Sequence, residues 1–193
     1  MEEFKTWFLI GYEHIVNKEA LDHILFVLAL SIIYDLRMLK KLILLVTAFT
    51  IGHSLTLVLS TLELITYNQK IIEFAIPLTI AFTCVANISI RNSSSNAKVL
   101  NRNYWLALSF GLIHGLGFSN YLKALLNEGS ILLPLFSFNV GLEIGQILII
   151  SVFVFCSHWL SGLIFPKKSD WIMFVSSLIL GISLLLLYNA KFW

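Results

Sequence analysis

Charged residues are scarce in this sequence, and the scarcity excludes most classes of soluble protein. Only 12% of the 193 residues are charged and 58% are hydrophobic, whereas soluble domains carry roughly 25% charged residues. The formal net charge of +2 gives no electrostatic basis for binding a nucleic acid. We therefore expect a polytopic membrane protein in contact with the lipid bilayer. At about 20 residues per crossing, the chain has room for six or seven spans.

Cysteine and proline are also few. Cys84 and Cys156 both lie in apolar segments, where they resemble small buried residues more than a disulfide or a thiolate metal site. Two of the three prolines, Pro77 and Pro134, fall near predicted span starts, where the missing N–H is tolerated. The first twenty residues lack a continuous apolar stretch followed by a small-residue cleavage site. We expect no cleavable signal peptide there.

The apolar runs are separated by clusters of charge, and this pattern predicts one all-α membrane domain over residues 1–193. Residues 1–19 are aromatic-rich but too charged to span, and they predict an outer-side interfacial segment with a helix over 4–16. Six transmembrane helices are predicted at residues 21–34, 42–62, 71–90, 104–125, 131–160 and 171–188.

The distribution of lysine and arginine predicts the orientation of these spans. The connections after the first, third and fifth spans carry eight basic residues: Arg37, Lys40, Lys41, Arg91, Lys98, Arg102, Lys167 and Lys168. The alternate connections carry only Lys70 and Lys123. Because basic loops stay in the cytoplasm, we expect both termini outside, in a bacterial inner membrane. The reversed topology is the alternative.

Ionisable and polar side chains lie at membrane depth, where they are costly and mark functional sites. His53 falls about 18 Å along its helix from Lys41, and His114 about 15 Å from Tyr104. Span five carries polar residues on one face at i, i+4 and i+7. The residues of this outer half, on several segments, are His14, Asp22, His23, His53, Glu73, His114, Asn139, Glu143 and Gln146.

Imidazole and carboxylate together suit divalent zinc, nickel, cobalt, copper or iron, and we expect nickel, cobalt or zinc. Structural roles stand beside this interpretation. His53 alone could serve as a hydrogen-bonding group between helices. Gly111 and Gly115 around His114 form a G-x-x-x-G pair typical of close helix packing. Asp22 could cap the first span.

Four segments together resemble the HupE/UreJ family of hydrogenase and urease accessory membrane proteins. They are G-Y-E-H…L-D-H-I-L-F, T-A-F-T-I-G-H-S-L-T-L, F-G-L-I-H-G-L-G-F and F-N-V-G-L-E-I-G-Q, in this order over residues 11–146. The resemblance implies a small multi-spanning protein that handles nickel, cobalt or another divalent metal, with metalloenzyme maturation proteins as partners. The family motifs map onto His14, Asp22, His23, Gly52, His53, Ser54, His114, Gly115, Gly117, Asn139, Gly141 and Glu143. Seven residues separate His14 from Asp22, whereas the family usually has five.

Three functions are consistent with these residues. The first is a divalent metal transporter, in which His14, Asp22 and His23 capture the ion and His53, His114 and Glu143 bind it at depth. Ser54, Glu73, Asn139 and Gln146 would then support the ligands. The second is an intramembrane metal-dependent hydrolase, with Glu143 or Asp22 as the general base. The third is an accessory subunit in which the polar groups only join helices. The sequence gives no oligomeric state.

Overall fold

The computed structural model describes residues 1–17, 20–93, 97–126, 131–165 and 167–192. These residues form seven α-helices, and the 3-10 turns Leu36–Met38 and Arg91–Ser93 precede α3 and α5. The helices are α1 (Glu2–Val16), α2 (Leu21–Ser31), α3 (Leu39–Thr61), α4 (Gln69–Ile90), α5 (Ala97–Leu125), α6 (Leu132–Ile164) and α7 (Lys168–Asn189). The expected all-α helix bundle is confirmed.

Four helices of the described chain are long and apolar enough to cross a membrane: α3 with its preceding turn, α4, α6 and α7. Helix α5 has 29 residues and contains the fourth predicted span. Helix α2 has 11 residues, too few to cross alone, because a crossing takes about 20. The chain therefore has the helices of a multi-pass membrane protein, and six crossings remain a prediction.

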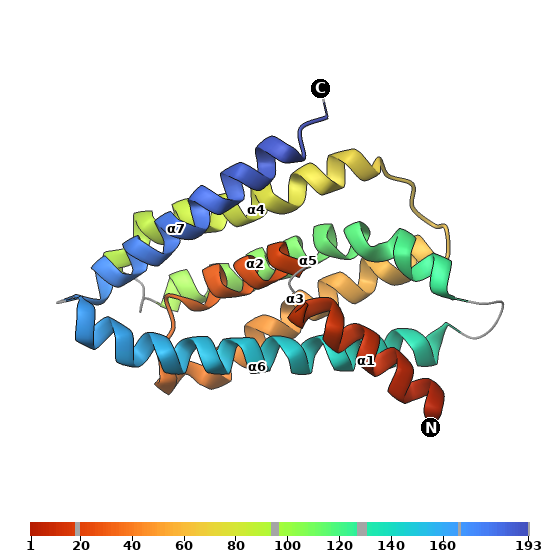
Figure 1. Cartoon of the computed structure of the whole chain (residues 1–193), viewed down its shortest axis with the longest axis horizontal. Helices are drawn as coiled ribbons and strands as arrows, with labels where there is room; N and C mark the ends of the chain where they lie inside the picture. The colour runs from red at the N-terminus through yellow and green to blue at the C-terminus, as the bar shows by residue number, and fades with distance from the viewer. Residues whose placement is uncertain (18–19, 94–96, 127–130, 166, 193) are drawn as a thin grey trace.

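The connections of the bundle gather at two ends (Figure 1). The last residues of α2, α4 and α6 and the first residues of α3, α5 and α7 lie at one end. The N-terminus, the α3–α4 connection, the last residues of α5 and the first residues of α6 lie at the other end, and α7 runs toward it. All eight basic residues of the first, third and fifth connections belong to segments at the first end. This basic end is the one that charge bias predicts to be cytoplasmic.

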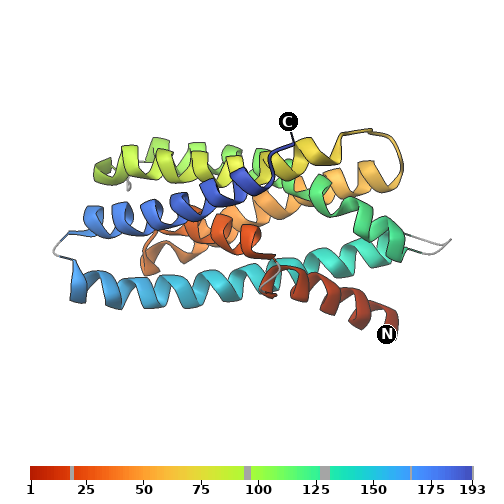
Figure 2. The ribbon, with the colours of Figure 1, turned by 45° about the horizontal axis from the view of Figure 1, so that its top comes forward.

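Helix α1, which falls in the predicted interfacial segment, packs along α6 at the edge of the bundle (Figure 2). Two glycines allow the approach. A Cβ on Gly11 would lie 2.0 Å from the Phe138 carbonyl oxygen, and one on Gly141 would lie 2.0 Å from that of Phe8. Trp7 and Ile15, on the same helix, are buried. Helix α2 begins where α1 stops, near the middle of the bundle, and continues toward the basic end.

Helices α3 and α5 also pack with their backbones in contact, as the G-x-x-x-G pair predicts. A Cβ on Gly111 would lie 2.2 Å from the Phe49 carbonyl oxygen, and one on Gly115 would lie 2.4 Å from that of His53. Small residues at such crossings are how membrane helices approach closely. The packing fixes His53 and His114 at the same level of the bundle.

Two apolar clusters lie on either side of that level. The larger, toward the basic end, includes Phe26, Phe49 and Ile80. The smaller, toward the opposite end, includes Leu57 and Phe138. Along α3, His53 falls between Phe49 and Leu57, so polar groups interrupt an otherwise apolar core. That interruption is where a functional site is expected in a membrane protein.

Candidate metal centre

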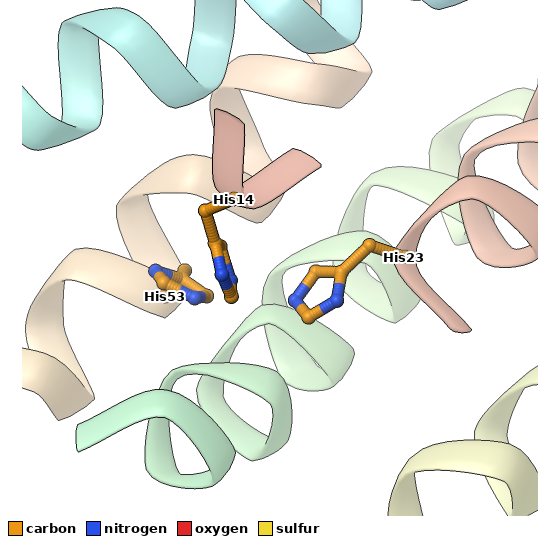
Figure 3. A group of neighbouring side chains, drawn as sticks. All are labelled: His14, His23 and His53. Atoms are coloured by element: carbon orange, nitrogen blue, oxygen red, sulfur yellow. The ribbon is translucent and has the colours of Figure 1, made fainter. Parts of the chain in front are cut away.

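Three histidines from three helices converge in the middle of the bundle (Figure 3). His14 comes from the end of α1, His23 from the start of α2, and His53 from the middle of α3. One nitrogen from each ring lies within 4.8 Å of the other two. Ligands of a tetrahedral ion at 2.0–2.1 Å would be about 3.4 Å apart. A closure of little more than 1 Å, by rotation of the side chains, would bring the three nitrogens onto one ion.

Four of the six ring nitrogens of this cluster are buried without hydrogen-bond partners in the described chain. They are Nε2 of His14, Nε2 of His23, and both ring nitrogens of His53. The His53 side chain is 0% exposed. A buried polar atom without a partner costs free energy, and such atoms in native proteins call for a specific reason. A bound cation would provide one, because each neutral imidazole has a nitrogen lone pair to donate.

Asp22 orients one of the three rings. Its Oδ1 lies 2.9 Å from Nδ1 of His23 and also accepts a hydrogen bond from the His23 backbone N–H at 2.8 Å. The pairing places the ring proton on Nδ1 and leaves Nε2 with a free lone pair. A carboxylate that holds a histidine in this way is the common support of a metal-binding imidazole. The structure therefore places Asp22, predicted as a ligand, behind His23.

His114 lies beside the three histidines. Its ring centroid is 5.0 Å from that of His23, and the side chain is 0% exposed. Its Nε2 lies 3.3 Å from the Thr79 hydroxyl, and its Nδ1 is buried without a partner among the residues described. No nitrogen of His114 falls within the set formed by His14, His23 and His53. His114 is thus a neighbour of the cluster.

A cavity of about 500 Å³ leads to the cluster. Its walls include Glu13, His14, Asp22, His23, Glu73 and His114. Glu13, Glu73 and Tyr121 at its rim are exposed. Glu73 lies near the start of α4 and Tyr121 near the end of α5, in the half of the bundle away from the basic connections, so the cavity opens on that half. Glu13 was not among the predicted site residues, because its place at the cavity depends on how α1 packs on the other helices.

The other predicted residues have hydrogen-bond partners outside the histidine cluster. Glu143 accepts a hydrogen bond from the Thr47 hydroxyl at 2.5 Å, and the Gln146 side-chain oxygen accepts one from Thr50 at 3.1 Å. Both pairs join α3 to α6, and Thr47 is about 9 Å from His53 along the helix, toward the basic end. The remaining two bond within their own helices: Asn139 donates to the Leu135 carbonyl and Ser54 to that of Thr50.

The helices and the buried histidine cluster together define a multi-pass membrane protein with a candidate site for a divalent metal. The family model described as HupE / UreJ protein matches residues 1–191, nearly the whole chain. The chain belongs to the HupE/UreJ family, as the four motifs predict. Comparison with curated proteins and with solved structures gives no match.

Proposed function

We propose that the protein is a membrane transporter for a divalent first-row metal ion, nickel or cobalt, and that His14, His23 and His53 form its binding site. The observation that carries the proposal is the convergence of unpartnered, buried imidazole nitrogens at the inner end of a cavity. Neutral imidazoles are ligands that these ions favour. Zinc fits the same donors.

The charges around the site favour a cation. Asp22 adds a negative charge behind His23 at 2.9 Å, which partly offsets the charge of an ion held by three neutral ligands. Glu13 and Glu73 at the cavity rim attract cations from the outer solution. Such attraction raises the local concentration of the ion at the mouth. The ion is the cargo in this scheme, so the site has to release it again.

The arrangement of α1 and α2 supports six crossings with both termini outside. Their 15 and 11 residues extend for about 39 Å in total at 1.5 Å per residue, enough for a hydrocarbon core of about 30 Å. We propose that the two helices form one discontinuous crossing, with the histidine cluster at the break. Transporters often place their sites at such interrupted helices. The membrane is then a bacterial inner membrane, with the basic end in the cytoplasm.

A metal-dependent hydrolase is the second candidate, because three histidines beside a cavity leave a position for water. Such an enzyme needs a carboxylate base close to that water. The two carboxylates predicted for this role have other partners: Asp22 pairs with His23, and Glu143 with Thr47. These pairings favour transport over hydrolysis.

Metal content and uptake test the proposal together. Purified protein should bind nickel or cobalt, and His14→Ala, His23→Ala and His53→Ala should each lower the occupancy at micromolar metal at least tenfold. His158→Ala is the matched control, because His158 is exposed on α6. Proteoliposomes that contain the wild-type protein should accumulate the ion. A wild-type protein without metal affinity, or a His53→Ala variant with full occupancy, would contradict the proposal. Binding without accumulation would favour the hydrolase.

A further inference from the structure

Helix α4 carries a buried polar stripe that the cluster does not use. Thr79, Thr83 and Asn87 follow one another at intervals of four residues and are only 6%, 4% and 3% exposed. The opposite face of the helix presents Phe82 and Val85, which are exposed. Apolar residues would satisfy the packing of a membrane helix at lower cost. A polar stripe on the inner face therefore calls for a function.

The stripe begins beside His114. The Thr79 hydroxyl lies 3.3 Å from Nε2 of His114, which is one of the cavity walls. From there α4 runs toward the basic end, and Asn87 lies about 12 Å further along it. Asn87 donates a hydrogen bond of 2.6 Å to the carbonyl oxygen of Ala29, in the last turn of α2.

Further polar groups continue from Asn87 toward the same end. Tyr34 follows α2 in the chain, and its buried hydroxyl lies next to the side chain of Asn103 on α5. Ser31, also buried, lies between Ala29 and Tyr34 in the sequence. Oxygen atoms from α2, α4 and α5 thus extend from the level of His114 toward the basic end.

We propose that this stripe of Thr79, Thr83 and Asn87 is the inward route by which the metal ion leaves the histidine site for the cytoplasmic end. The inference rests on the proposed transport function. Hydroxyl and amide oxygens are neutral, so they hold a divalent ion, or the water around it, less tightly than a histidine cluster. Conduction needs such weak sites, because an ion has to leave each position that it enters.

A second polar series starts near His53 and is less suited to the role. Its members, Thr50 with Gln146 and Thr47 with Glu143, bond to each other across α3 and α6. Glu143 and Thr47 are only partly buried. Beyond them α6 buries Ile150 and Val154 in the apolar cluster. This series therefore ends where α6 packs in the apolar cluster.

The competing explanation of the stripe is structural. Thr79 donates to the Ile76 carbonyl at 2.7 Å and Thr83 to that of Thr79 at 2.8 Å, bonds that threonine often makes within a helix. In this explanation, the only role of Asn87 is to cap the end of α2 through its bond to the Ala29 carbonyl. These bonds use the proton of each hydroxyl and leave oxygen lone pairs for an ion or its water. Uptake distinguishes the two explanations, since a structural role does not predict a selective loss of transport.

The experiment compares binding and uptake in Thr83→Val, Asn87→Leu and the double variant. Valine has nearly the shape of threonine, so Thr83→Val tests the route even if Asn87→Leu folds poorly. Ser89→Ala is the control: Ser89 lies on the same helix, is exposed, and makes the same type of bond, to the Val85 carbonyl. With nickel as the probe, we expect dissociation constants within twofold of wild type for every variant. The initial uptake rate in proteoliposomes should fall at least threefold in Thr83→Val and tenfold in the double variant, and stay unchanged in Ser89→Ala.

Two results would overturn the route. One is wild-type uptake by a folded Thr83→Val or double variant that still binds nickel. The other is a parallel loss of binding and uptake in Thr83→Val, which would make the stripe structural. Failure of the proposed transport function can be told apart from failure of the inward route. It would appear in the wild-type protein, which would then show no nickel binding or no uptake.

Discussion

Oδ1 of Asp22 lies 2.9 Å from Nδ1 of His23, and this pairing decides which nitrogen of His23 faces the other histidines. The ring proton is held on the side of the carboxylate. Nε2 is then the ligand atom, and it is one of the buried nitrogens without a partner. His23 is therefore placed as a ligand and Asp22 as the residue that orients it. The sequence alone does not distinguish these roles, because the two residues are adjacent.

Asp22→Asn should therefore weaken metal binding without abolishing it. Loss of the partner of a metal-binding histidine typically costs 10–100-fold in affinity, so we expect an increase of about that size in the dissociation constant. Titration calorimetry in detergent should give the same stoichiometry as wild type, whereas His23→Ala loses the site. Asp170→Asn, in the first turn of α7, is the control. Equal loss in Asp22→Asn and His23→Ala would instead make Asp22 a ligand.

Acidification should release the ion. Imidazole binds a metal only when it is neutral, so protons compete with the ion for the three ligands. The affinity should be highest above pH 7 and fall steadily as the pH drops to 5. Nickel titrations across this range measure the effect, with the release of protons on binding as a second readout. An affinity that does not change with pH would exclude a histidine site.

Close packing of α1 on α6 should be needed to place His14. Gly141→Ala puts a Cβ 2.0 Å from the Phe8 carbonyl oxygen, so α1 has to move away from α6. We expect a melting temperature lower by several degrees and at least a tenfold loss of metal affinity. Gly181→Ala is the control, since a Cβ there meets nothing within 4 Å. Unchanged affinity in a destabilised Gly141→Ala protein would show that His14 is not a ligand.

The helices could be predicted from the sequence because segments that contact lipid are apolar, and charged residues cluster where the chain leaves the bilayer. Predicted spans 42–62 and 71–90 compare with Leu39–Thr61 and Gln69–Ile90 in the structure. It also singled out the histidines that form the cluster. The position of α1 was not predictable in the same way. Its path along α6 depends on which glycines meet across the interface, and a single sequence carries no information on such pairs.

The grouping of the polar residues was less predictable, for a related reason. Depth along a helix can be estimated from residue counts, but rotation about its axis decides the neighbours of a side chain. Glu143 bonds to Thr47, which lies about 9 Å along α3 from His53 toward the basic end. His14 has an altered motif spacing and is nevertheless in the cluster. Only the packing of α3 against α5 and α6 determines these outcomes.

The carboxylates at the cavity rim should control capture of the ion more than its passage. Glu13 and Glu73 are exposed and line the cavity, so they raise the cation concentration at its mouth without holding the ion at the histidines. The Glu13→Gln, Glu73→Gln double variant should therefore raise the half-saturating nickel concentration for uptake about three- to tenfold and leave the maximal rate within twofold. Screening by salt should reduce the difference from wild type between 10 and 300 mM sodium chloride. Glu63→Gln is the control, because Glu63 is exposed in the α3–α4 connection and does not line the cavity. A fall in the maximal rate with an unchanged half-saturating concentration would place these carboxylates on the transport path itself.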